Sequence, residues 1–146
     1  MRALSRMQDP TKLRVWHLAH ELSADVVRLL PSARCRAVPA LRLQTIRAAS
    51  SVPANIAAGC GTRTPREFGQ HLEAALAALL ELQTRLVEAR GDGVLPERDQ
   101  EFLQAKLTSV RRMLISFIAA VSRVPDPGIA VTMAVHEAVP AVSPPA

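Results

Sequence analysis

The sequence predicts an all-α fold: an antiparallel up-down-up-down four-helix bundle with a Pro-rich C-terminal tail. Apolar residues recur at alternating spacings of three and four through four long segments, which places them on one face of each helix. Prolines and glycines fall between these segments, where they mark helix ends and short connections. The length of 146 residues suits one domain, which we expect at 10–123, between an N-terminal extension at 1–9 and the tail at 124–146.

The first helix is expected to begin at Asp9 and Pro10, because an N-cap followed by proline is a common start. It should run to about Leu30, before the next proline. A loop at 31–40 then leads to an antiparallel second helix. The apolar stripe of the first helix comprises Leu13, Trp16, Leu22, Val26 and Leu29.

The second helix, predicted at 41–58, contains a proline. We expect a kink at Pro53, because its ring pushes against the carbonyl one turn earlier and it donates no backbone hydrogen bond. Ser50, Ser51 and Asn55 form a polar notch beside it. One interpretation is that the notch binds a ligand; the other, which we favour, is that these side chains satisfy backbone groups freed by the kink.

The third helix has the clearest start signal in the chain. Thr64 can cap it, Pro65 suits its first position, and Glu67 can reach back to complete a capping box. A seam with spacings of four and three runs to about Arg90 and comprises Phe68, Leu72, Ala75, Leu79, Leu82, Leu86 and Ala89.

A second apolar stripe on this helix, made of Leu76, Leu80 and Val87, suggests contact with another subunit. Tight packing inside the monomer is the alternative. The fourth helix is expected from Pro96 to Arg123, with a seam of Leu103, Leu107, Val110, Leu114, Phe117 and Val121.

A discontinuous pattern runs from the second helix into the third: Gln44, Arg47-Ala48-Ala49-Ser50, Val52-Pro53-Ala54-Asn55-Ile56-Ala57, Gly59, Arg63 and Glu67-Phe68. With Leu13, Val15, Trp16 and Ala19 upstream and Glu81-Leu82 downstream, it resembles a family of four-helix bundles encoded in intervening sequences of 23S ribosomal RNA genes. Two departures from that family matter: it has Arg where this chain has Ile46, and Glu where this chain has Ala58. It also often has Gly-Ser where this chain has Ala77-Ala78. If the absent Arg and Glu serve a shared site, that site is altered here.

The resemblance implies a partner class as well as a fold. Relatives include ring-shaped pentamers with a basic surface, and accessory proteins of diversity-generating retroelements that partner a reverse transcriptase and its template RNA. By this resemblance we expect a homo-oligomer, for which a pentamer is one arrangement, and nucleic acid as a ligand. The candidate phosphate contacts on or near the matched stretch are Arg42, Arg47, Arg63 and Arg66.

The charge is unevenly distributed along the chain. The net charge is +5, yet residues 1–63 carry ten basic and three acidic residues, residues 64–123 carry eight of each, and residues 124–146 carry two acidic residues. Sixteen of the eighteen cations are Arg, whose guanidinium group matches phosphate. A nucleic-acid-binding surface and an ordinary solvated helix surface both fit, because no basic run is contiguous and no aromatic residue is interleaved for stacking.

The sequence contains no catalytic constellation, so we expect no enzyme, cofactor or metal. His17, His20 and Glu21 are spaced as ligands on one helix, but zinc sites usually draw ligands from more than one element.

Two cysteines, Cys35 and Cys60, fall in predicted connections that could meet at one end of a hairpin, and we expect both as thiols. No run of eighteen apolar residues or signal peptide is apparent, which favours a cytoplasmic location without membrane contact.

Two functions therefore compete: a nucleic-acid-binding bundle, and a protein-interaction or scaffolding module without a nucleic-acid role. Charge placement discriminates between them. Arg residues of the first two helices that converge on one exposed face favour the first function. Arg residues that scatter, or that pair with Glu73, Glu81 and Glu88, favour the second.

The tail, which holds five prolines, is expected to be mobile or to act as an arm on a neighbouring subunit.

Overall fold

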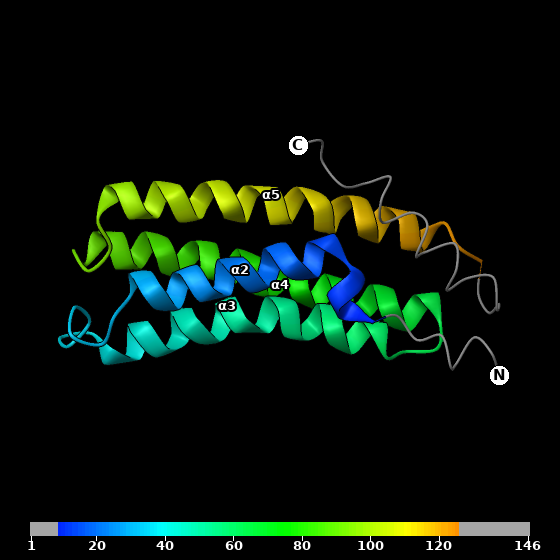
Figure 1. Cartoon of the computed structure of the whole chain (residues 1–146), viewed down its shortest axis with the longest axis horizontal. Coiled ribbons are helices and arrows are strands. Elements are labelled where there is room, and N and C mark those ends of the chain that lie inside the picture. Colours follow the sequence, from blue (N-terminus) through cyan, green and yellow to red (C-terminus); the bar gives the residue numbers. More distant parts are fainter. Residues whose placement is uncertain (1–8, 126–146) are drawn as a thin grey trace.

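The computed structural model describes residues 9–125, and nearly all of the predicted N-terminal extension and tail lies outside this range. The described chain is all-helical (Figure 1). Its elements are a 3-10 turn, η1 (Pro10–Lys12), and four α-helices, α2 (Arg14–Leu29), α3 (Pro39–Cys60), α4 (Pro65–Gly91) and α5 (Glu97–Ser122). Each helix runs antiparallel to the next, and α2 and α5 pack together to close the bundle, so the predicted fold class is confirmed.

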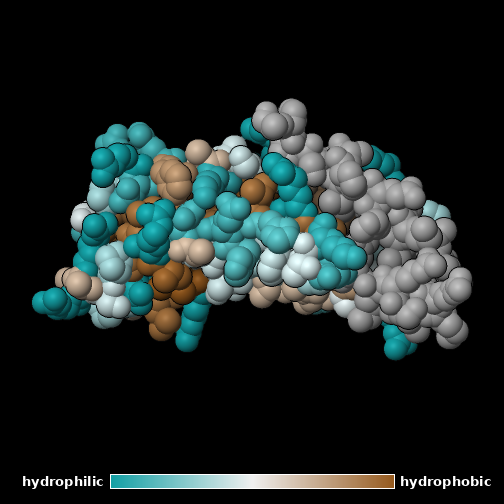
Figure 2. Space-filling model, in the orientation of Figure 1, coloured by the Kyte–Doolittle hydropathy of each residue, from teal (hydrophilic) through white to brown (hydrophobic). Residues whose placement is uncertain are grey.

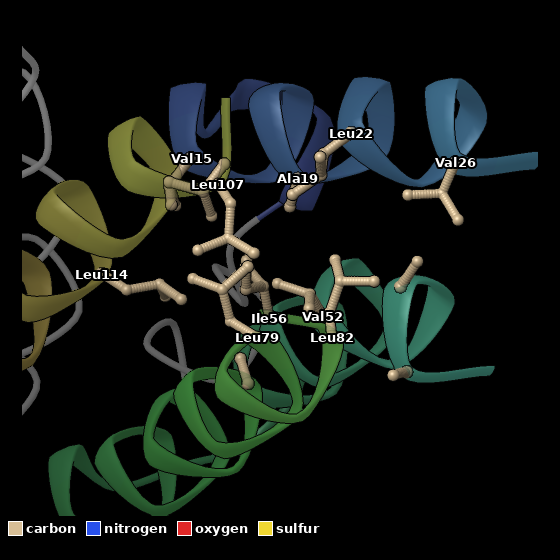
Figure 3. Packing of buried hydrophobic residues seen from close by; sticks show 14 of the residues in the cluster. Val15, Ala19, Leu22, Val26, Val52, Ile56, Leu79, Leu82, Leu107 and Leu114 are labelled. Carbon is tan, nitrogen blue, oxygen red and sulfur yellow. The ribbon is translucent and has the colours of Figure 1, made fainter. Parts of the chain in front are cut away.

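The core is formed by one seam from each helix, and its side chains point toward one another across the bundle (Figure 3). All seven predicted seam residues of α4 and all six of α5 are buried. The α2 seam consists of Val15, Ala19, Leu22 and Val26, while Trp16 and Leu29 are half-buried at its edges. Aliphatic side chains fill most of this core, as the low aromatic content requires.

The first helix begins later than predicted, at Arg14 rather than at Pro10. The Asp9 side chain does act as a cap, but it accepts a hydrogen bond from the Thr11 backbone N–H at 3.0 Å and closes only the 3-10 turn. Leu13 is then extended, with φ −97° and ψ 123°, and its side chain is fully buried. Burying the Leu13 side chain between the turn and the helix therefore contributes more stability than continuing the helix from the cap would.

The turn from α3 to α4 follows the predicted cap. Thr64 Oγ1 accepts a hydrogen bond from the Glu67 backbone N–H at 3.1 Å. Glu67 Oε1 accepts in return from the Arg63 N–H at 3.2 Å, one residue before the cap. Just before the turn, Gly59 is buried against Phe68 of α4, and a Cβ at this position would lie 2.8 Å from Phe68 Cδ1. Glycine therefore lets the two helices approach closely here.

The two cysteines lie far apart, although their predicted connections could have met at one end of a hairpin. Cys35 lies in the loop before α3, and Cys60 is the last residue of that helix. They are separated by the whole of α3, about 30 Å at 1.5 Å per residue. Both are free and buried.

Among the described residues, no helix is long and apolar enough to cross a membrane.

Candidate nucleic-acid interface

Five cations lie toward one end of the bundle, because the up-down topology brings the starts of α2 and α4 together with the ends of α3 and α5 (Figure 1). We call this set the basic end: Lys12, Arg14, Arg63, Arg66 and Arg123. All five side chains are exposed. None of them forms an ion pair with another described residue.

Two acidic residues near the basic end, Asp9 and Glu67, accept hydrogen bonds from backbone N–H groups. Asp9 accepts hydrogen bonds from the side chain and the backbone N–H of Thr11, and these bonds lower the pKa of its carboxyl group. Glu67 accepts from the backbone N–H of Arg63. Glu73 follows about two turns into α4. Cations therefore outnumber carboxylates here, and the guanidinium groups are free of partners within residues 9–125.

Ion pairing is more extensive at the opposite end, where α2 meets the loop before α3. Arg28 lies 3.1 Å from Asp25, Arg34 lies 3.8 Å from Asp99, and Arg90 lies 3.1 Å from Glu97, measured between the nitrogen and oxygen atoms. Such exposed pairs contribute little to stability, but they reduce the positive potential around them. Ion pairs thus neutralise part of the positive charge at the opposite end, whereas the cations of the basic end form none within residues 9–125.

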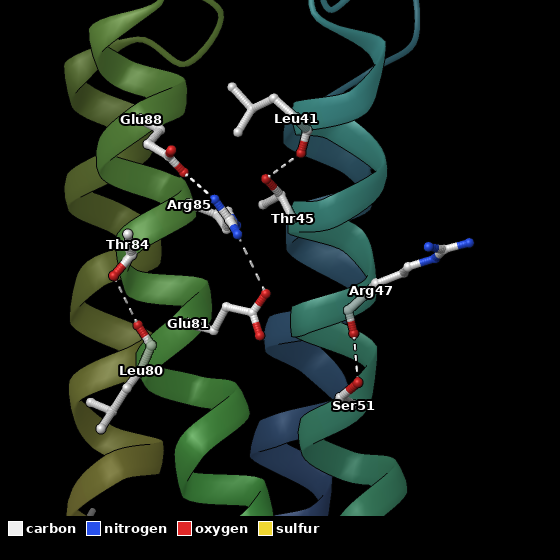
Figure 4. Close-up of polar contacts among 9 residues, drawn as sticks. All are labelled: Leu41, Thr45, Arg47, Ser51, Leu80, Glu81, Thr84, Arg85 and Glu88. Atoms are coloured by element: carbon white, nitrogen blue, oxygen red, sulfur yellow. Dashed lines mark hydrogen bonds and ion pairs between the residues drawn. The ribbon is translucent and has the colours of Figure 1, made fainter.

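The four predicted phosphate contacts are not brought together. Arg63 and Arg66 belong to the basic end, whereas Arg47 lies midway along α3 on its exposed side and points away from α4 (Figure 4). Arg42 lies at the other end of α3, where its Nε donates a hydrogen bond of 2.7 Å to the Leu30 carbonyl. This half-buried side chain fastens the end of α2 to the start of α3, a role that depends on a tertiary contact.

Three residues of the basic end, namely Lys12, Arg14 and Arg123, were missed by the sequence analysis. Lys12 and Arg14 lie about thirty residues before the first predicted contact, Arg42, and Arg123 lies more than fifty residues after the last, Arg66. The signal that finds them is topological, because alternating helices place residues near positions 13, 63 and 123 at the same end. The sequence therefore contained this information once four antiparallel helices were assumed.

The polar notch at Pro53 is built from bonds within α3. Ser50 and Ser51 both donate to the Arg47 carbonyl, at 3.2 and 2.8 Å, and Asn55 donates to the Ser51 carbonyl at 2.8 Å. The helix runs unbroken through Pro53. These bonds keep the polar side chains within α3, but they do not reach the Ala49 carbonyl, which lacks its usual donor because of Pro53, so the expected pairing of freed backbone groups is not observed for these three side chains.

The second stripe of α4 is only partly covered. Leu76 packs against the core, but Leu80 and Val87 remain 43% and 57% exposed. Packing inside the monomer therefore accounts for Leu76 alone. A further apolar surface appears on the face shown in Figure 2, over the end of α2 and the start of α3. Val27 of α2 and Leu43 of α3 are also exposed.

The glutamates of α4 do not pair with the Arg residues of α2 or α3. Arg85 of the same helix lies 3.7 Å from Glu81 and 2.8 Å from Glu88 (Figure 4). The Arg residues of α2 and α3 scatter instead of converging on one face: Arg14 lies at the basic end, Arg47 lies midway along α3, and Arg28 and Arg42 lie at the opposite end. By the criterion given above, this scatter favours the interaction module, whereas the unpaired cations of the basic end within residues 9–125 favour a nucleic-acid-binding surface. Pairing with these glutamates, which would have favoured the interaction module, is not observed in the described chain.

The histidines of α2 lie beside Trp16. The Trp16 ring stacks on His20 with centroids 5.0 Å apart and meets His17 edge-on at 5.1 Å. Within residues 9–125, no group of three or more His, Cys, Asp or Glu is placed to hold a metal ion.

Comparison with known proteins assigns the chain to a protein family. A search of curated proteins found no match to the chain. The sequence profile described as 23S rRNA-intervening sequence protein matches residues 11–116, which span α2, α3, α4 and most of α5. This match covers well over half of the sequence. The chain therefore belongs to the 23S rRNA-intervening sequence protein family.

Proposed function

We propose that this protein is a non-enzymatic, oligomeric bundle that binds structured RNA or DNA and acts as an accessory factor. The observation that supports the proposal is the basic end, with five exposed cations that have no ion-pair partner in the described chain. Four of the five are Arg, which donates two parallel hydrogen bonds to phosphate. The family name refers to 23S rRNA and does not specify a ligand.

The expected mode of binding is electrostatic. Contacts to phosphate position a protein on nucleic acid but carry little sequence information. The basic end is formed by helix termini and a turn: its cations lie on η1, on α2, in the turn between α3 and α4, on α4, and directly after α5. We therefore expect affinity that depends strongly on salt and weakly on base sequence.

Self-association is the second part of the proposal. Leu80 and Val87 lie seven residues apart on α4 and are both exposed, as expected for a stripe that packs against another copy. If nucleic acid does not bind, this stripe supports the alternative function, a protein-interaction or scaffolding module. A pentamer remains the arrangement implied by the family resemblance.

The test is binding of purified protein to a structured RNA and a duplex DNA across a salt series, with the mass of the assembly measured in the same buffer. The proposal predicts an oligomer whose affinity falls linearly with log salt. Replacing Leu80 and Val87 by Ser should lower the mass of the assembly. Absence of binding at about 50 mM salt, which favours phosphate contacts, would contradict the nucleic-acid role and leave the interaction module.

A further inference from the structure

A hollow of about 270 Å³ lies between α2 and α5, toward the end of the molecule opposite to the basic end. We call it the aromatic pocket, and it is lined by Arg28, Leu29, Arg98, Asp99 and Phe102. None of these residues belongs to the surface proposed above. Its volume lies just below the range typical of pockets for drug-sized ligands, which suits a single planar ring system.

Phe102 differs from the other phenylalanines of the protein. Phe68 and Phe117 pack edge-on to each other in the core, with ring centroids 5.4 Å apart. Phe102 is 43% exposed and lies off the buried seam of α5. It therefore provides an exposed aromatic surface on α5, four residues from Arg98 and four from Lys106.

The pocket is organised by Asp25 of α2. This partly buried carboxylate accepts a hydrogen bond from Arg28 Nη2 at 3.1 Å and another from Lys106 Nζ of α5. The same Lys106 nitrogen lies 5.0 Å from the centroid of the Phe102 ring. One carboxylate thus holds both the guanidinium group on one side of the pocket and the cation that contacts its aromatic ring.

Two of the three charged residues that line the pocket, Arg28 and Arg98, are cations, so the lining has a net positive charge despite the ion pairs around it. Arg98 has no ion-pair partner in the described chain, and Arg28 is 60% exposed beyond its contact with Asp25. Asp99 is already 3.8 Å from Arg34. The pocket therefore combines an exposed aromatic ring and an aliphatic side chain with two guanidinium groups that remain accessible at its rim.

We propose that the aromatic pocket binds one unpaired nucleotide of a single-stranded nucleic acid, with the base against Phe102 and the phosphate on Arg28 and Arg98. This inference rests on the proposed nucleic-acid function and deepens it, because it names the form of the ligand. A base inside a duplex is already stacked and cannot reach the ring, whereas an unpaired base stacks on aromatic side chains readily. Phe102 and Arg98 are thus specificity residues for single strands.

The test compares two probes of the same sequence, a fluorescent single strand and its duplex. Phe102→Ala should weaken single-strand binding by roughly tenfold, as expected for loss of one stacked base, and leave duplex binding within about twofold. Phe102→Trp should retain the wild-type preference because it retains a ring. Arg98→Gln should weaken single-strand binding and reduce its salt dependence.

Two variants control for non-specific effects. Ile115→Ala truncates another apolar residue of α5 with similar exposure, 48%, and should leave both affinities unchanged. If Phe102→Ala lowers the melting temperature, the affinities of Phe102→Leu, which preserves apolar volume, are compared with those of the wild type instead. The pocket assignment would be overturned if Phe102→Ala weakened binding of the single strand and of the duplex equally. It would also be overturned if Phe102→Leu and Phe102→Trp had the same affinity for the single strand. Wild-type binding to the duplex alone overturns it and leaves the proposed function, whereas binding to neither probe overturns both.

Discussion

Replacing Gly59 by Ala should destabilise the bundle even though alanine is the better helix former. In an open helix interior this substitution stabilises by about 1 kcal/mol, and by less near a helix end. Gly59 is the last residue but one of α3 and is buried against α4. An added Cβ would lie 2.8 Å from Phe68 Cδ1 and 3.1 Å from the Cβ of His71.

The cost of that contact depends on whether the Phe68 ring can move. The ring is 7% exposed and packs edge-on against Phe117, with centroids 5.4 Å apart, so a shift disturbs a second aromatic residue in the core. Overpacking of this kind typically costs about 1–3 kcal/mol. After the helix-propensity gain is subtracted, Gly59→Ala should lower the free energy of unfolding by about 1–2 kcal/mol.

Urea unfolding followed by circular dichroism measures this change, at the same protein concentration for every variant, because the stability of a protein that associates depends on its concentration. Gly91→Ala is the matched control, since a Cβ there meets no atom within 4 Å, and it should be neutral or stabilising by up to about 1 kcal/mol. In a Phe68→Leu background, the cost of Gly59→Ala should shrink. If Gly59→Ala stabilises the protein as much as Gly91→Ala does, the close approach of α3 and α4 is wrong.

Three further predictions follow from caps and titrating groups. Thr64→Ala should cost about 1 kcal/mol in unfolding free energy while Thr64→Asp keeps the cap, and equal stability of the two variants would refute the capping role. Burial raises the pKa of the Asp25 carboxyl group, but hydrogen bonds from Lys106 and Arg28 outweigh burial, so its pKa is lower in the folded than in the unfolded protein. Asp25→Asn should therefore lower the free energy of unfolding by its full amount near neutral pH and by less as the pH falls below about 4. A difference in urea midpoints that does not change with pH would contradict this. Burial raises the pKa of the Cys60 thiol to about 12, so a disulfide reagent at pH 8 should modify it only after unfolding, and rapid reaction of the native protein would contradict its burial.

The fold was predictable because spacing along a helix encodes which face is buried. Every seam residue predicted for the third and fourth helices is buried, and the Thr64 cap was correct in its main bond. The start of the first helix was not predictable in the same way, since local signals at Asp9 fit a 3-10 turn as well as a helix. Burial of Leu13, a tertiary effect, decided it.

The candidate site was less predictable, because it depends on contacts between distant segments. Arg42 and Arg63 look equivalent in the sequence, yet one bonds the Leu30 carbonyl and the other is unpaired among the described residues. Phe102 likewise gains its basic neighbour Arg28 from a helix more than seventy residues away. Sequence spacing gives the exposed face of one helix, whereas only packing shows which faces adjoin.

The most direct test of the central claim, that the basic end contacts phosphate, is the salt dependence of binding to duplex DNA for two charge-matched double variants. Arg63→Gln with Arg66→Gln should reduce the slope of log affinity against log salt by about 1.8, or about 0.9 for each phosphate that the protein no longer neutralises. Arg111→Gln with Arg112→Gln removes the same charge from exposed residues midway along α5 and should leave the slope nearly unchanged. Equal slopes for the two variants would contradict a localised interface at the basic end.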